Sequence, residues 1–264
     1  MHIFDQAIQL NKQSEGLSVG KTTPEYQNMV GPYGGALCAI LLNAVVIDEK
    51  RIGDPISVTI HFAAPVAEGE FEVKATAVRT NRSTQHWLVE LIQGGEVAVY
   101  GTVFTGIRRE TWGDGESRFP VVPAPETITH GFHVTLPWTK AYDFNFIEGG
   151  PQVSPLKGKP SQTRMWIRDE PPRKLDFVSL SSICDSFFPR IFLKRGYRVP
   201  IGTVVLTTHF HVSQEQIDQV GDGHLLGVAD AKTYGKGYFD QSSELWSKEG
   251  VLLATSHQMV YYKE

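Results

Sequence analysis

The sequence has few cysteines, and this scarcity narrows the kinds of chemistry that the chain can support. Only two of its 264 residues are cysteine, Cys38 and Cys184, and neither has a Cys-x-x-Cys partner. Each lies in a segment that is predicted to be a buried helix. Sparse cysteine in such segments predicts two reduced core thiols in a cytoplasmic protein.

Charge of either sign and long apolar runs are also scarce. The chain has 25 Lys and Arg against 29 Asp and Glu, with a net charge of −4 and no basic cluster. This excludes nucleic acid or an anionic membrane as the main partner. The longest apolar run, 36–47, is interrupted by Asn43 and falls short of the about 20 residues that a bilayer span needs. The N-terminus lacks a basic stretch followed by an apolar core, so we expect no targeting segment and a cytoplasmic location.

Several motifs of enzyme chemistry are missing as well. The absence of Gly-x-Gly-x-x-Gly and of a P-loop argues against dinucleotide or ATP chemistry. The absence of Gly-x-Ser-x-Gly argues against a serine nucleophile on a strand-to-helix elbow. His209 and His211 share one face of a predicted strand and could join His257 around a metal ion. The spacing carries little specificity and no acid is fixed beside it, so we expect neither a metal nor another cofactor.

What the sequence does contain is one building block that occurs twice. Thr59-Ile60-His61-Phe62 follows a first apolar helix, and Thr207-Thr208-His209-Phe210 follows a second helix 148 positions later. A period of this length is too long for a solenoid and fits a duplicated domain. A residue type that occurs in only one of the two helices is then a functional candidate.

The pattern of apolar residues predicts similar elements in both halves. In the first half it predicts a short helix within 3–10, an extended segment at 15–26, a helix at 36–47 and strands at 57–62, 70–79, 87–93 and 97–107. In the second half it predicts a strand at 162–168, a helix at 177–192 bent at Pro189, and strands at 201–212, 224–234, 238–246 and 251–262. We therefore predict an α+β protein with two tandem domains, each an antiparallel sheet wrapped round a central helix. Residues 1–112 form the first domain, 113–160 a Pro-rich linker that packs partly on the domains, and 161–264 the second domain.

Asp185 is the acid that distinguishes the second helix from the first. It lies among apolar and small side chains, whereas the first helix has no acid before Asp48 at its end. A buried carboxylate is costly unless it is hydrogen-bonded. Asp185 is therefore either a structural residue that bonds to nearby amides or a functional acid or base.

Thr203 and Gln258 lie on strands that pairing could bring beside Asp185. A carboxylate, a hydroxyl and a carboxamide together could hold one water molecule and aim it at a carbonyl carbon while the carboxylate takes a proton. Strict alternation places Thr203 on the face opposite Val204 and Leu206. A bulge or a second sheet is therefore needed to turn Thr203 inward.

Gly34 and Gly35 begin the first helix. Backbone N–H groups at a helix start have no partner within the helix, and its dipole favours negative charge there. Since glycine also lets a ligand approach closely, the pair could stabilise an oxyanion, each donor contributing roughly 3 kcal/mol. A tight turn alone would use the same residues.

Taken in order, these residues resemble the acyl-CoA thioesterase II-like family, the double hotdog thioesterases, over about 15–264. Gly34-Gly35-Ala36-Leu37 is similar to the Gly-Gly helix entry of the family, and Asp185-Ser186-Phe187-Phe188-Pro189 to the region that carries its catalytic Asp. Thr203 stands eight positions before His211, as the catalytic Thr of the family does. The stretch 254–258 is similar to the closing strand, which ends on the catalytic Gln, here Gln258. Val205-Leu206 stands where the family often has Asp-His.

The resemblance implies a double hotdog fold and hydrolysis of an acyl-CoA thioester to a carboxylic acid and CoA. It implies Asp185 as general base, with Thr203 and Gln258 orienting the water and an N–H at Gly34 or Gly35, or at the second helix, binding the oxyanion. Acyl-CoA is then the partner, and hotdog analogy implies a homodimer or higher homo-oligomer. Lys74, Arg79 or Arg82 could meet the CoA phosphates. The alternatives are a non-catalytic acyl-CoA or lipid-binding protein on the same fold and, more weakly, a hotdog dehydratase or hydratase.

Overall fold

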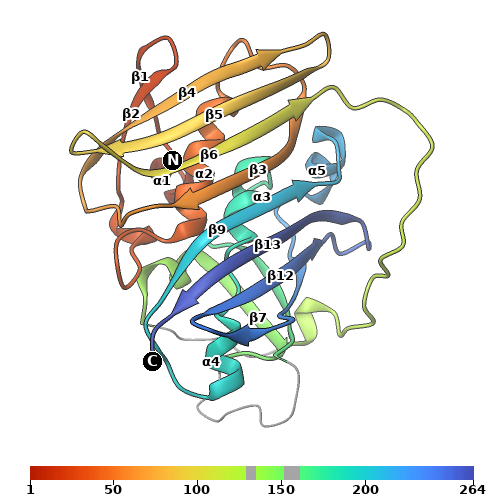
Figure 1. Cartoon of the computed structure of the whole chain (residues 1–264). Coiled ribbons are helices and arrows are strands. Elements are labelled where there is room, and N and C mark those ends of the chain that lie inside the picture. The colour runs from red at the N-terminus through yellow and green to blue at the C-terminus, as the bar shows by residue number, and fades with distance from the viewer. Residues whose placement is uncertain (129–134, 152–160) are drawn as a thin grey trace.

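All thirteen strands in the described part of the chain join one antiparallel sheet, whose two halves lie side by side (Figure 1). The computed structural model describes residues 1–128, 135–151 and 161–264. The strand order is β1-β2-β4-β5-β6-β3-β9-β13-β12-β10-β8-β7, with β11 paired to β12. The strands are β1 (Asn11–Ser14), β2 (Leu17–Lys21), β3 (Asp54–Phe62), β4 (Glu70–Thr80), β5 (Thr84–Gln93), β6 (Glu96–Gly106), β7 (Tyr142–Glu148), β8 (Thr163–Asp169), β9 (Ile201–Phe210), β10 (Leu225–Asp230), β11 (Tyr234–Gly235), β12 (Tyr238–Trp246) and β13 (Leu252–Tyr262).

The helices are short, apart from the one at the centre of the first half. They are α1 (Ile3–Ala7), α2 (Gly34–Val46), α3 (Phe177–Ile183), α4 (Arg190–Arg195) and α5 (Gln214–Val220), with 3-10 turns at Pro24–Tyr26, Pro125–Thr127 and Pro137–Ala141. Within the described ranges, none of the helices is long and apolar enough to cross a membrane.

The two halves meet where β3 pairs with β9. Thr59 lies opposite Thr207 in this antiparallel register, and their hydroxyl oxygens are 3.0 Å apart. These are the two residues that the sequence repeat equates. Equivalent residues face each other across an antiparallel seam when a local two-fold axis relates two copies, so the seam is consistent with duplication of one domain.

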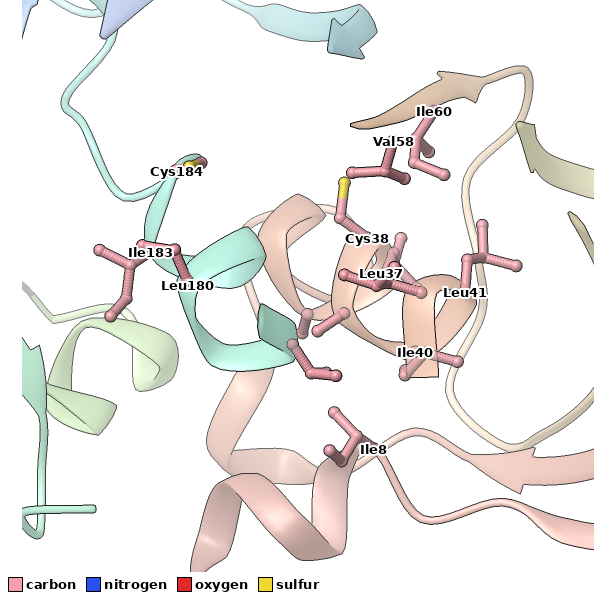
Figure 2. Packing of buried hydrophobic residues seen from close by; sticks show 14 of the residues in the cluster. Ile8, Leu37, Cys38, Ile40, Leu41, Val58, Ile60, Leu180, Ile183 and Cys184 are labelled. Atoms are coloured by element: carbon pink, nitrogen blue, oxygen red, sulfur yellow. The ribbon is translucent and has the colours of Figure 1, made fainter. Parts of the chain in front are cut away.

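The central helices of the two halves pack against each other behind the sheet. Figure 2 shows α2 and α3 side by side, with Val58 and Ile60 of β3 on the other side of α2. Cys38 on α2 points toward Val58, and one continuous core cluster includes residues of both halves. Because α2 is apolar on nearly every side, burial on all sides removes more apolar surface from water than docking one face would.

The helix expected at 177–192 is in fact two helices with an irregular segment between them. Helix α3 ends at Ile183 and α4 begins at Arg190, so Asp185 lies in the turn after α3 and not within a helix. Pro189 has no N–H to donate to residue 185, and a proline disfavours helical geometry for the residue before it. The chain is therefore broken before Pro189, where the sequence pattern predicts only a bend.

The linker expected at 113–160 contains a strand of the sheet that was not predicted from the sequence. Strand β7 pairs with β8, and its inward side chains, Tyr142 and Phe144, join the core. The alternation of these aromatics with Asp143 and Asn145 is a strand pattern that the surrounding prolines obscured. The parts of the expected linker at 129–134 and 152–160, including Phe132, lie outside the described residues. Helix α5 was also not predicted.

Candidate active site

Asp185 lies at the end of α3 and against the beginning of α2, so the site joins the two halves of the chain. The backbone N–H of Gly35 donates a hydrogen bond to its carboxylate. A Cβ atom added at Gly34 would lie 2.7 Å from Asp185 Oδ2. Glycine at this position is thus what lets the carboxylate approach the positive end of the α2 dipole.

Tyr33 holds the two helix ends together. Its hydroxyl donates to the backbone carbonyl of Ser182, at 2.7 Å, and its ring stacks on Trp138 with centroids 4.3 Å apart. Both aromatics are buried. The position of Asp185 relative to α2 is therefore fixed by packing as well as by hydrogen bonds.

The ionisation of Asp185 is shifted by its surroundings. Burial raises its pKa to about 7, and the opposing hydrogen bonds from Gln258 and from the Gly35 backbone are too weak to cancel that effect. Its side chain still keeps partial contact with solvent through a pocket. A carboxylate with a pKa near 7 exchanges protons readily at neutral pH, which suits a general acid or base.

Gln258 and Thr203 form a chain of hydrogen bonds that ends on Asp185. Thr203 Oγ1 donates to Gln258 Oε1 at 3.2 Å, and Gln258 Nε2 donates to Asp185 Oδ1 at 3.2 Å. The chain has one direction, because an ionised carboxylate can only accept. The three residues that were selected from the sequence are thus in contact in the structure.

A β-bulge turns Thr203 toward this site. Val205 pairs with Met259 while Thr203 pairs with Val260, so Val204 is the extra residue. One extra residue reverses the alternation beyond it, which places Thr203 on the inner face with Leu206. Val204, expected on the buried face, is 37% exposed for the same reason. The bulge that the sequence pattern required is therefore present.

A pocket of about 110 Å³ opens beside the three polar side chains. Its lining includes Asp185, Thr203 and Gln258, and most of its other walls are apolar. The apolar and aromatic residues that line it are Met29, Tyr33, Leu136, Trp138, Phe187, Phe188, Pro189, Phe192, Ile201, Phe239 and Val260. An apolar slot with a few polar groups at one side suits a small ligand with an apolar tail and a reactive polar end.

The cations beside this pocket differ from those expected. None of Lys74, Arg79 and Arg82 lines it, and Lys74 lies in a separate groove near the β1–β2 hairpin. Arg198, in the loop between α4 and β9, does line the pocket and is exposed. The assignment to those three residues is therefore not supported.

Two further polar residues near the pocket were not predicted from the sequence, Gln241 and Arg190. Gln241 lies on β12 directly opposite Gln258, and its side chain lines the pocket. Arg190 begins α4 and is fully buried, and burial lowers its pKa to about 10, so the guanidinium stays charged at neutral pH. The signal that could have found Arg190 is a lone charge in the apolar run 187–193.

None of the cysteines and histidines in the described ranges lines the pocket beside Asp185. Cys38 and Cys184 are both buried free thiols, and burial raises the pKa of Cys184 to about 12. His211 contacts the hydroxyl of Thr255 at 2.9 Å. In the three described ranges, no group of three or more His, Cys, Asp or Glu side chains has the arrangement of a metal site.

Comparison with known protein families gives two matches that together span most of the chain. Residues 23–106 match the N-terminal domain of acyl-CoA thioesterases, and residues 117–262 match the C-terminal domain of acyl-CoA thioesterases. No curated protein matches the chain.

Solved structures agree with the fold. A conserved protein of unknown function with a hot dog fold from Alicyclobacillus acidocaldarius is 41% identical, with a TM-score of 0.96 over 100% of this chain and 99% of that chain. The acyl-CoA thioesterase II TesB2 of Mycobacterium marinum is 16% identical, with a TM-score of 0.78 over 98% of each chain. The second likeness concerns the fold alone, which is a double hotdog.

Proposed function

Because the chain belongs to the acyl-CoA thioesterase II-like family of double hotdog proteins, we propose that it hydrolyses acyl-CoA thioesters to a carboxylic acid and CoA, with Asp185 as the general base. The observation that carries this proposal is the hydrogen-bonded chain from Thr203 through Gln258 to Asp185, at the side of an apolar pocket. The acyl tail occupies the pocket, and the thioester carbon lies beside the carboxylate.

In the proposed reaction, a water molecule bound to Asp185 is the nucleophile. Asp185 takes a proton from the water as its oxygen attacks the thioester carbon, while Thr203 and Gln258 fix its orientation. The tetrahedral intermediate collapses, the carbon–sulfur bond breaks, and the CoA thiolate leaves with the proton returned from Asp185. This route needs no covalent acyl-enzyme and no cofactor.

The negative charge that develops on the carbonyl oxygen needs a hydrogen-bond donor to stabilise it. The backbone N–H groups at the start of α2 are the best candidates for this donor. Gly35 N–H already donates a hydrogen bond to Asp185. We therefore assign the oxyanion to the N–H of Gly34, at the positive end of the helix dipole. Arg198 at the pocket is the cation that we assign to a phosphate group of CoA.

Thiol release from a panel of acyl-CoAs tests this function. Turnover in H₂¹⁸O under single-turnover conditions should place one ¹⁸O atom in the carboxylic acid product and leave no acyl group on the protein. Binding of acyl-CoA without release of thiol would instead identify a non-catalytic binding protein. Accumulation of an acylated protein would contradict direct attack by water.

The rate should depend on pH through Asp185. Since the base works only when ionised and its pKa is about 7, kcat/KM should rise about ten-fold per pH unit below pH 7 and level off above it. The measurement is kcat/KM for one acyl-CoA between pH 5 and pH 9, corrected for spontaneous hydrolysis. A flat profile across pH 6 to 8 would remove Asp185 from the role of base.

Replacing Thr203 by valine should lower kcat about five-fold. The change keeps the shape of the side chain but removes the hydroxyl that orients Gln258, and one such hydrogen bond contributes about 1 kcal/mol. Thr203→Ser is the matched control, because it keeps the hydroxyl and should keep most of the activity. Equal losses in the two variants would mean that the hydroxyl has no orienting role.

A further inference from the structure

The amide of Gln241 lines the pocket, and the proposed mechanism does not use it. It lies in register with Gln258 on the neighbouring strand, and only 3% of its surface is exposed. The apolar side chains of Phe239, Phe192 and Val260 line the same pocket. A polar group in such surroundings is costly unless it has a hydrogen-bond partner.

Arg190 decides which end of this amide faces the pocket. Arg190 Nε donates to Gln241 Oε1 at 3.2 Å. A guanidinium has five donors and no acceptor, so the amide oxygen has to face it and the NH₂ group has to face away. No hydrogen bond from Gln241 Nε2 to any residue of the described ranges is present, and the side chain lines the pocket.

The guanidinium is itself held rigidly. Its Nη1 donates to the carbonyl of Ser161 at 2.8 Å and to Thr163 Oγ1 at 2.6 Å. The single Nε–H is shared between Gln241 Oε1 and the carbonyl of Phe188, which lies 2.9 Å from Nε. Within the described part of the chain, no carboxylate forms an ion pair with Arg190. With Asp230 acting on it only from beyond ion-pair distance, its positive charge polarises the Gln241 amide and makes the NH₂ group a stronger donor.

We propose that Gln241 determines acyl specificity by donating a hydrogen bond to an oxygen of the acyl group beyond the thioester carbonyl, and that Arg190 is the positioning residue that fixes this donor. The acyl groups that fit carry a hydroxyl, oxo or carboxylate oxygen. A plain alkyl chain of the same length leaves the amide without an acceptor. This inference rests on the proposed function, since it names the substrate class of the same site.

Matched pairs of acyl-CoAs with equal carbon number test the inference. The acyl groups of the pairs have four, six and eight carbons, and one member of each pair carries a hydroxyl at carbon 3 or at the chain end. A dicarboxylic acyl-CoA of the same length is added, so that the effect of a charged oxygen can be distinguished from that of a neutral one. For at least one oxygen position, we expect kcat/KM to favour the oxygenated member about ten-fold or more, because a site built for a hydrogen bond rejects the analogue that lacks it.

Gln241→Met keeps the length of the side chain without the N–H donor. It should bring the ratio of kcat/KM between the oxygenated and the plain member of a pair close to one. Gln241→Glu keeps an oxygen for Arg190 but presents no N–H, so it should abolish the preference for the dicarboxylic member, whose ionised carboxylate can only accept, even if the methionine variant folds poorly. Arg190→Lys should raise KM for the oxygenated member with little change in kcat, because the amide is no longer held in one orientation.

The same pairs are also measured by calorimetry for binding to the Asp185→Asn variant, with and without Gln241→Met. A binding preference that disappears with Gln241→Met supports the inference even if no thioester is hydrolysed, which separates it from the proposed function. Equal binding and equal rates for every pair would overturn it. Equal losses for plain and oxygenated members in Gln241→Met would also overturn it, since the amide would then serve a group common to all substrates.

Discussion

Replacement of Asp185 by asparagine should lower kcat by about 10²–10⁴-fold, the contribution typical of a general base. Asparagine has nearly the same shape and can still accept the hydrogen bond from Gln258, so the loss reports the missing base and not a collapsed pocket. Steady-state thiol release with the best acyl-CoA of the panel measures the effect. A loss smaller than about three-fold would contradict the assignment of the base.

The same substitution should stabilise the protein at alkaline pH, which gives an independent check on folding. The pKa of Asp185 in the folded state, about 7, lies above the unfolded value of about 3.9, so the native state binds the extra proton between these values. Stability therefore falls as the pH rises from about 4 to 7. The asparagine side chain of the Asp185→Asn variant does not titrate, so the gain in unfolding free energy should be larger at pH 8 than at pH 5. Asp169, whose pKa burial also raises to about 7, is present in both proteins and cancels in the comparison.

Replacement of Gly35 by alanine should destabilise the protein by about 1–3 kcal/mol, the usual cost of inserting an atom into a packed core. The added Cβ would lie well inside van der Waals contact with the carbonyl oxygen of Ser182 and 2.5 Å from the ring of Tyr33. A backbone atom cannot move aside without displacing α3. The gain in helix propensity, at most about 1 kcal/mol, is too small to offset this overlap. Urea unfolding followed by circular dichroism measures the difference.

The Gly35→Ala variant should also lose activity, because displacing the end of α3 moves Asp185 away from α2. Gly235→Ala is the matched control, since no heavy atom lies within 4 Å of a Cβ added there. Its unfolding free energy should stay within about 0.5 kcal/mol of the wild type. Equal stability of the two alanine variants would mean that α2 and α3 are not in close contact at Gly35.

Much of the fold could be predicted from the local sequence pattern, because apolar and polar residues alternate within most of the strands. The strands that become β5 and β6 and the repeat that equates Thr59 with Thr207 can both be recognised in the sequence. Strand β7 was not predicted because prolines surround it. The helix predicted at 177–192 is longer than the observed α3 because the apolar periodicity continues through Pro189. Local propensity does not show where contacts with distant parts of the chain end a helix or add a strand.

By itself, the sequence determined the residue types of the site: a lone acid among apolar neighbours, a glycine pair at a helix start, and a threonine and a glutamine on later strands. Only the tertiary structure decided that Asp185 meets the start of α2, that a bulge at Val204 turns Thr203 inward, and that Arg190 orients Gln241. The physical reason is that these contacts join segments more than 50 residues apart, from Arg190–Gln241 to Gly35–Asp185. Sheet register and helix packing set such contacts, and both depend on the whole chain.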